Sequence, residues 1–411
     1  MTTTTNPSGW LTARRLRAHA IILAACLWSV YVWDMATPGL RDRSGNLKGT
    51  DFLHFYTLGT LALEHRANDL YDMNAQATVA GRRVPPAAGI RYLPLYPPQV
   101  SMGFAPLARL SYGWALGLWW AFSAAVYGVC CLAIWLGCPN LQRHGGLIAL
   151  LAIAFPAFFH LIAWGQTSAL ALACFTLAFL LMRSRRDFLA GLGLGCLIFK
   201  PQLGLAAAVL FVTIGAWKLV AGAAASAAVQ LGAGVLYYGV DPLRQWVLRL
   251  VNVRSVVPWL EPKPYQTHSL RTFWSMLVPW ADVASALYVL TAVMVLALTV
   301  GMWKRSQTPL ALRYSALLLA TVLIAPHLTV YDLVILAPMF LLMADWMVGQ
   351  ASASSPRWLG TVLYLVYTLP LLGLLARWTH VQLAVIAMAG CLYLVWRASA
   401  RAFQAPEAIS S

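Results

Sequence analysis

The sequence predicts an all-α membrane protein that crosses the bilayer about twelve times, and two observations lead to this fold class. Of its 411 residues, 60% are hydrophobic and 10% are charged, whereas soluble domains average about 45–50% and about 25%. Apolar stretches of about 20 residues, long enough to cross a hydrocarbon core of about 30 Å, recur along most of the chain. A water-soluble fold could not bury so much apolar surface.

Basic residues near the start of the chain orient the predicted helices. Arg14, Arg15 and Arg17 precede the first apolar stretch, which we interpret as an uncleaved anchor and not as a signal peptide. Placing them in the cytosol puts both termini inside, and most other basic residues then fall in short inner loops. The expected spans are residues 20–36, 112–136, 146–163, 167–183, 188–199, 203–216, 219–238, 283–303, 310–325, 329–347, 358–376 and 380–396.

Two segments that this topology places outside are too long to be turns. They comprise about residues 37–111 and 239–282. The chain contains no internal repeat, low-complexity tract or separate soluble domain. We therefore expect residues 1–411 to form one integral membrane domain whose function depends on these two outer loops.

The formal net charge of +16 raises the question of nucleic-acid binding. The basic residues mostly flank apolar segments, however, which is how charge that sets membrane topology is distributed. We therefore exclude nucleic acid as a partner and expect contact with membrane lipid. The seven cysteines lie in or beside apolar segments and lack metal-ligand spacing.

In the first outer loop, residues 51–66 (DFLHFYTLGTLALEHR) are expected to form a helix in the outer membrane interface. Apolar residues recur there at helical spacing, at Phe52, Phe55, Tyr56 and Leu63. Asp51 and His54, three residues apart, would share a neighbouring face of that helix. A Pro-rich stretch at residues 91–110 then returns the chain to the membrane.

Short motifs follow one another along the chain from the first outer loop onward. In the first loop these motifs are an acidic residue followed by Phe at Asp51, then LYD, YPP and a later Pro-Leu. Four later fragments follow: GQTSALAL (165–172), AGLGLGCLIFKPQLGL (190–205), QTHSLRTF (266–273) and APHLTVYDLVILAP (325–338). The order of these motifs resembles that of glycosyltransferase family 87. In the last fragment many relatives carry paired histidines, where this chain has His327, Tyr331 and Asp332.

The resemblance implies the architecture of the C-type membrane glycosyltransferases and an activity. Such an enzyme would move a hexose, expected to be mannose, from a polyprenyl-phosphate donor to a lipid or glycan acceptor with inversion. It would be a multi-pass protein of the bacterial inner (plasma) membrane with its active site facing the periplasm or exterior. No cofactor is expected.

Asp51 is the predicted general base, because inverting transfer needs a group that takes the proton of the acceptor hydroxyl. His54 would orient that carboxylate or contact a sugar hydroxyl. The alternatives are an acidic residue favoured by the helix dipole and a solvated loop histidine. A metal held by this pair with His327 or Asp332 is a further alternative, but scattered ligands are thin support and we predict no metal site.

Lys200 is the predicted contact for the donor phosphate, with Gln202 nearby. The flanking spans 188–199 and 203–216 are only about 18 and about 21 Å long as helices, which places this lysine near membrane depth. A charge in that position is costly and tends to be kept for a ligand. The alternative is a lysine that extends to the lipid headgroups.

The remaining predicted substrate-binding residues come from the family-like motifs. They are Gln166 in the Gly-Gln turn, His268, Ser269 and Arg271 in the second outer loop, and His327, Tyr331 and Asp332 in the late turn. Arg271 represents the cations that would neutralise a leaving phosphate.

Two other functions compete with this interpretation. A transporter or flippase for lipid-linked sugars would be expected to show repeated halves and charges far from the helix ends, and the sequence shows neither. A ligase or polymerase acting on lipid-linked oligosaccharide would also use outer arginines and a long outer loop.

Overall fold

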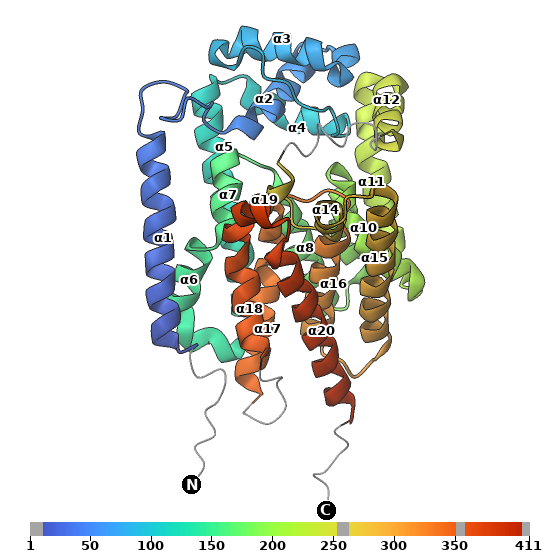
Figure 1. Ribbon diagram of the computed structural model, residues 1–411. Coiled ribbons are helices and arrows are strands. Elements are labelled where there is room, and N and C mark those ends of the chain that lie inside the picture. Colours follow the sequence, from blue (N-terminus) through green and yellow to red (C-terminus); the bar gives the residue numbers. More distant parts are fainter. Residues whose placement is uncertain (1–10, 253–262, 351–357, 405–411) are drawn as a thin grey trace, which may run out of the picture.

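The computed structural model describes residues 11–252, 263–350 and 358–404, and within them the predicted all-α class is confirmed. These parts of the chain contain no strand, and 80% of the structure is helical. Long helices form a bundle, and several short helices cover one of its ends (Figure 1).

The covering helices come from the first long loop, and we call them the cap. They are α2 (Thr50–Leu63), η1 (Ala67–Tyr71), α3 (Met73–Arg83), η2 (Pro85–Ala87) and α4 (Gln99–Ala108). The bundle comprises α1 (Ala13–Met35), α5 (Tyr112–Leu136), η3 (Pro139–His144), α6 (Gly145–Ile153), α7 (Pro156–Trp164), α8 (Ser168–Arg183), α9 (Asp187–Gly195), η4 (Cys196–Phe199), α10 (Pro201–Thr213), α11 (Trp217–Tyr238), α12 (Val240–Val251), η6 (Pro264–Gln266), α14 (Leu270–Leu277), α15 (Ala281–Lys304), α16 (Leu310–Ile324), η7 (Val330–Leu336), α17 (Ala337–Gly349), α18 (Leu359–Thr368), η8 (Leu369–Leu375), α19 (Ala376–Thr379) and α20 (Leu383–Gln404).

Helix lengths and composition indicate a multi-pass membrane protein. Among the described residues, 7 helices are long and apolar enough to cross a membrane, and a bent pair at residues 139–164 raises the number to 8. Shorter apolar helices cover residues 168–183, 187–199, 201–213 and 310–324. Each predicted span coincides with one of these helices or helix pairs, so the helix positions are confirmed, while the number of twelve crossings stays a prediction.

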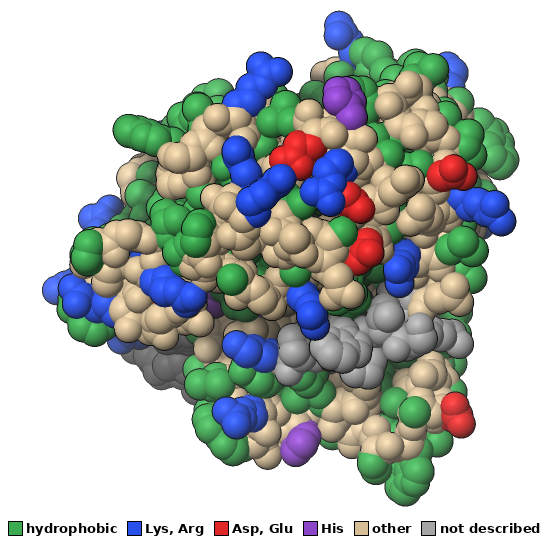
Figure 2. Space-filling view, turned by 90° about the horizontal axis from the view of Figure 1, so that it is seen from above, with side chains coloured by type: hydrophobic (Ala, Val, Ile, Leu, Met, Phe, Trp, Pro, Cys, Tyr) green, Lys and Arg blue, Asp and Glu red, His purple; other side chains and the backbone are tan. Residues whose placement is uncertain are grey.

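The two ends of the bundle differ in the way that the sequence predicts. Helix α1 begins and α20 ends at the end opposite the cap, whereas α12 from the second long loop lies at the capped end (Figure 1). Figure 2 views the capped end from above and shows Lys and Arg side chains spread over it. The predicted orientation of this end towards the cell exterior stays a prediction.

Helix α2 confirms the predicted helix but corrects its predicted setting in the interface. Every residue from Phe52 to Ala62 is buried, so the helix exposes no polar face. The hydroxyl groups of Thr57 and Thr60 donate to backbone carbonyls one turn earlier, at 2.8 and 3.0 Å, which satisfies them inside the cap. A Cβ at Gly59 would lie 2.4 Å from the carbonyl oxygen of Phe104, so glycine allows α4 to pack closely on α2.

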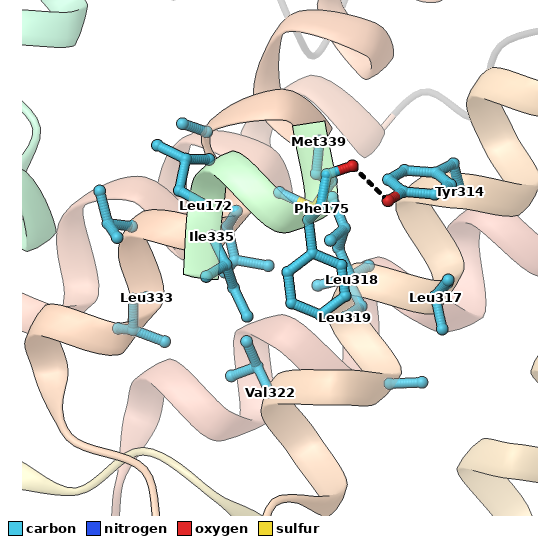
Figure 3. Packing of buried hydrophobic residues seen from close by; sticks show 14 of the residues in the cluster. Leu172, Phe175, Tyr314, Leu317, Leu318, Leu319, Val322, Leu333, Ile335 and Met339 are labelled. Carbon is cyan, nitrogen blue, oxygen red and sulfur yellow. Dashed lines mark hydrogen bonds between the residues drawn. The ribbon is translucent and has the colours of Figure 1, made fainter. Parts of the chain in front are cut away.

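The core of the bundle fixes the helix ends that carry the polar residues. Leu172 and Phe175 on α8 pack with apolar side chains of α16, η7 and α17 (Figure 3). The hydroxyl of Tyr314 donates to the carbonyl of Phe175 at 2.5 Å and ties α16 to α8. This packing places the start of α8 beside the start of η7.

Candidate functional site

The predicted base, Asp51, lies in the first turn of α2 beside the turn between α7 and α8. Gly165 in this turn has a left-handed φ of 70°, and a Cβ there would lie 2.7 Å from the Cβ of Phe52. Glycine is therefore needed both for the turn and for its approach to α2. The indole of Trp119 donates to the Gly165 carbonyl at 3.0 Å. As a result, the side-chain amide of Gln166 donates to Asp51 Oδ2 at 2.6 Å.

A buried ion pair lies next to this turn. Lys200 Nζ is 2.8 Å from Asp332 Oδ1, and both side chains are almost inaccessible. Ser168, at the start of α8, accepts a hydrogen bond from Lys200 at 3.0 Å and donates to Asp332 Oδ1 at 2.5 Å. The other oxygen of Asp332 accepts from the backbone N–H of Thr329 at 3.2 Å. Lys200, the predicted contact for the donor phosphate, thus has its charge balanced by a carboxylate.

Gln166 joins the ion pair to Asp51. Its side-chain oxygen faces two donors, Lys200 Nζ at 3.5 Å and the N–H of Thr167 at 3.3 Å. This arrangement turns the amide NH₂ group towards the Asp51 carboxylate. Among the residues that form this network, Asp51 is partly exposed and the others are buried, so Asp51 is its most accessible member.

The surroundings of Asp51 change its acidity. Burial raises the pKa of Asp51 to about 6, and the hydrogen bond from Gln166 and the charge of Lys200 oppose this rise. The carboxyl group is therefore ionised at neutral pH while remaining far more basic than an exposed aspartate. A pKa close to the working pH favours a general base.

His54 is buried beside aromatic rings and does not orient Asp51 through a hydrogen bond. Its ring centroid lies 5.1 Å from that of Tyr92 and 5.6 Å from that of Tyr96. Neither ring nitrogen has a hydrogen-bond partner among the described residues. Burial lowers the pKa of His54 to about 4, so the ring is neutral at pH 7. The alternative of a solvated loop histidine is wrong, because the side chain is 4% exposed.

The second outer loop pairs with the late turn. The N–H of His268 donates to the carbonyl of Leu328 at 3.1 Å, and the guanidinium of Arg271 donates to the carbonyl of Pro326. The next residue of the turn, Thr329, caps η7, which carries the acidic member of the ion pair. Two motifs that are distant in sequence therefore meet beside the network.

Two predicted residues of this second loop are buried without polar partners. Within the described ranges, the two ring nitrogens of His268 and the hydroxyl of Ser269 have no hydrogen-bond partner. Burial lowers the pKa of His268 to about 3. Leaving buried donors and acceptors unsatisfied is costly, so these groups are candidates for contact with a polar ligand.

Three predicted substrate-binding residues remain, and of these Tyr331 lies beside the ion pair, with Lys200 Nζ 5.2 Å from its ring centroid. His327 is partly buried in the late turn, and Gln202 is partly buried in the first turn of α10. No hydrogen bond in the described part of the chain joins Gln202 to the network.

A metal site finds no support in this geometry. Within the described ranges, no group of three or more His, Cys, Asp or Glu side chains is placed to hold a metal ion. Asp51 and His54 are therefore not grouped with His327 or Asp332 in a way that could hold a metal ion.

Sequence reasoning missed Ser168 and Tyr96. Ser168 belongs to the GQTSALAL motif, and its polar side chain at the start of an apolar span was an available signal. Tyr96 belongs to the YPP motif, but nothing in the sequence indicates that its ring packs against that of His54.

Comparisons with known proteins identify the family. No curated protein and no solved structure gave a match. The sequence model of glycosyltransferase family 87 matches residues 95–326, which is more than half of the chain. The matched region contains Gln166, Lys200 and Arg271 and ends before Asp332. The chain belongs to glycosyltransferase family 87.

Proposed function

We propose that this membrane glycosyltransferase moves a hexose, mannose in the first instance, from a polyprenyl-phosphate donor to a lipid or glycan acceptor with inversion. The observation that carries the proposal is the Asp51 carboxyl group. It is accessible in part, has a pKa near 6 and receives a hydrogen bond from Gln166. These are the properties of a general base at neutral pH.

In the proposed reaction, the acceptor hydroxyl transfers its proton to Asp51 as its oxygen attacks the anomeric carbon. The bond between that carbon and the phosphate oxygen breaks, and its electron pair leaves with the polyprenyl phosphate. Attack on the face opposite the leaving group inverts the anomeric centre. Asp51 later returns the proton to water.

Lys200 acts in this proposal as a positioning residue. Its ammonium group has three N–H donors, and three acceptors surround it, on Asp332, Ser168 and Gln166. This coordination holds Gln166 against Asp51. We assign the contact with the donor phosphate to Arg271, a partly buried residue of the second outer loop.

Neutral imidazoles complete the proposed sugar site. His54 and His268 each offer one donor and one acceptor, which matches the alternating donor and acceptor character of sugar hydroxyl groups. Ser269 adds a further hydroxyl group. We assign Gln202, His327 and Tyr331 to the walls of the substrate site, and Asp332 to the support of Lys200.

Membership of a glycosyltransferase family sets the transporter or flippase alternative aside. A ligase or polymerase for lipid-linked oligosaccharides stays the second candidate, because the outer Arg271 would suit a pyrophosphate as well as a phosphate.

The test compares donors on the purified protein in lipid nanodiscs. Polyprenyl-phosphate mannose, polyprenyl-phosphate glucose and an undecaprenyl-pyrophosphate oligosaccharide are each supplied with a mixture of lipid and glycan acceptors. We expect acceptor-dependent release of polyprenyl phosphate from the monosaccharide donors, fastest with mannose. Release from the pyrophosphate donor alone would establish the second candidate, and product of retained configuration would contradict the inverting mechanism.

A further inference from the structure

A cavity of about 710 Å³ opens at the capped end of α5, apart from the network around Asp51. It lies where the ends of α3 and α4 meet the start of α5. The polar and aromatic residues that line it are Tyr56, Arg83, Arg109, Ser111, Tyr112 and Trp114. None of the residues that bind one another around Lys200 is among them.

The two arginines of this cavity lack acidic partners. Arg83 is held by the carbonyl of Ala108 at 2.6 Å and lies 5.9 Å from the ring centroid of Tyr56. Arg109 is exposed, and within the described ranges its side chain has no hydrogen bond or ion pair. No Asp or Glu lines the cavity, so its positive charge is uncompensated.

Two other arginines of the cap are neutralised by a carboxylate. Arg66 and Arg82 both form ion pairs with Glu64. Arg83 and Arg109, by contrast, line one cavity without a carboxylate, so an anion there would meet two cations and no competing acidic group.

The cavity opens at the start of α5, next to an exposed apolar side of this helix. Helix α5 is one of the helices long enough to span a membrane. Along one side of it, Trp114, Leu118 and Phe122 follow one another a turn apart and are 75%, 51% and 45% exposed. An exposed tryptophan at the start of a spanning helix is typical of the headgroup region. A lipid whose chains lie along this side would bring its headgroup to Arg109.

We propose that this cavity binds the phosphate group of an anionic membrane lipid, with Arg83 and Arg109 as its contacts and the acyl chains along α5. The shared chemistry is that of a phosphate group, which a free phosphate ion would also offer. The apolar side of α5 favours the lipid. This inference does not depend on the function proposed for Asp51.

A bound lipid would rest against a residue that holds the start of α2. The hydroxyl of Tyr112 donates to the carbonyls of Lys48 and Gly49 at 2.8 and 2.9 Å. These residues directly precede the helix that carries Asp51. The lipid site and the candidate catalytic site therefore share one supporting side chain.

The test measures binding of dihexanoyl phosphatidic acid to the full-length protein in detergent, by the change in tryptophan fluorescence. Dihexanoylglycerol and inorganic phosphate are the comparison ligands. We expect the phosphatidic acid to bind best, and Arg83→Gln/Arg109→Gln to weaken it about tenfold or more, because charge-assisted hydrogen bonds are lost. The matched variant Arg82→Gln/Arg91→Gln removes two arginines of the same loop outside the cavity and should change the affinity less than about twofold.

Three results would overturn the proposal. They are equal affinity in the Arg83/Arg109 variant, equal binding of dihexanoylglycerol, and displacement of the lipid by an equal concentration of inorganic phosphate. If the double variant does not fold, the single variant Arg109→Gln takes its place in the binding measurement. It is expected to fold, because the Arg109 side chain has no partner within the described residues. It should keep the thermal stability of the wild type and still weaken binding of the phosphatidic acid.

Discussion

The buried network and the cavity at α5 use charge in opposite ways. In the network, Lys200 and Asp332 neutralise each other at 2.8 Å and are closed off from solvent. In the cavity, Arg83 and Arg109 have no acidic partner. Compensated charge in the interior holds other groups in place, whereas uncompensated charge at the edge is available to a ligand. Asp51 stands between these cases, since its nearest polar partner is the uncharged amide of Gln166.

The largest effect is expected from removing the carboxylate of Asp51, the most accessible residue of the buried network. Asp51→Asn should lower the transfer rate by about 10²–10⁴-fold, because it removes the proposed base. The measurement is polyprenyl phosphate release by purified protein. Asp282→Asn is the matched control, since Asp282 also lies in the first turn of a helix but is exposed. An Asp51→Asn enzyme as active as the control would exclude Asp51 as the base.

Breaking the buried pair should affect stability more than breaking any contact of the cavity. Lys200→Met leaves the Asp332 carboxylate buried without a counter-charge, which should cost about 3–5 kcal/mol. The double variant Lys200→Met/Asp332→Leu should recover most of that loss. Thermal unfolding in one detergent measures both, with Arg109→Gln as the control expected to match the wild type. A Lys200→Met protein of unchanged stability would show that the pair contributes no structural constraint.

The pH dependence of transfer tests the link between the network and Asp51. Because only ionised Asp51 accepts a proton, kcat/KM should fall as the pH is lowered through about 6, approaching tenfold per pH unit. The Gln166 hydrogen bond lowers the pKa of Asp51, so Gln166→Leu should move this decline to higher pH. An unchanged pH profile in the variant would separate Gln166 from the titrating group.

The smallest effect is expected at His54. Its pKa of about 4 keeps the ring neutral over the whole range in which Asp51 titrates, so His54→Gln should leave the position of the acid limb unchanged. If the ring binds a sugar hydroxyl, KM should rise by about fivefold to tenfold through the lost hydrogen bond. A shifted acid limb would instead mean that His54 itself titrates in the reaction.

The sequence predicted elements better than contacts. Each apolar stretch that we predicted to be a span is a helix or helix pair in the structure. Such stretches are recognisable because their length and composition are local properties of the sequence. The pairing of Lys200 with Asp332 was not predictable from one sequence, since 132 residues separate them and hydropathy carries no information on partners. For α2, the spacing of Phe52, Phe55 and Tyr56 fits an interfacial helix and a buried one equally well. The packing of α4 on α2 shows that the helix is buried, and this contact cannot be read from the spacing.

The contact between Gly165 and Phe52 has a consequence for how substrates arrive. Because α2 packs directly on the turn between α7 and α8, moving α2 away from this turn would also separate Asp51 from the amide of Gln166. For the proposed polyprenyl-phosphate donor, we therefore expect lateral approach between helices, with the hydrocarbon tail remaining in the lipid throughout the reaction.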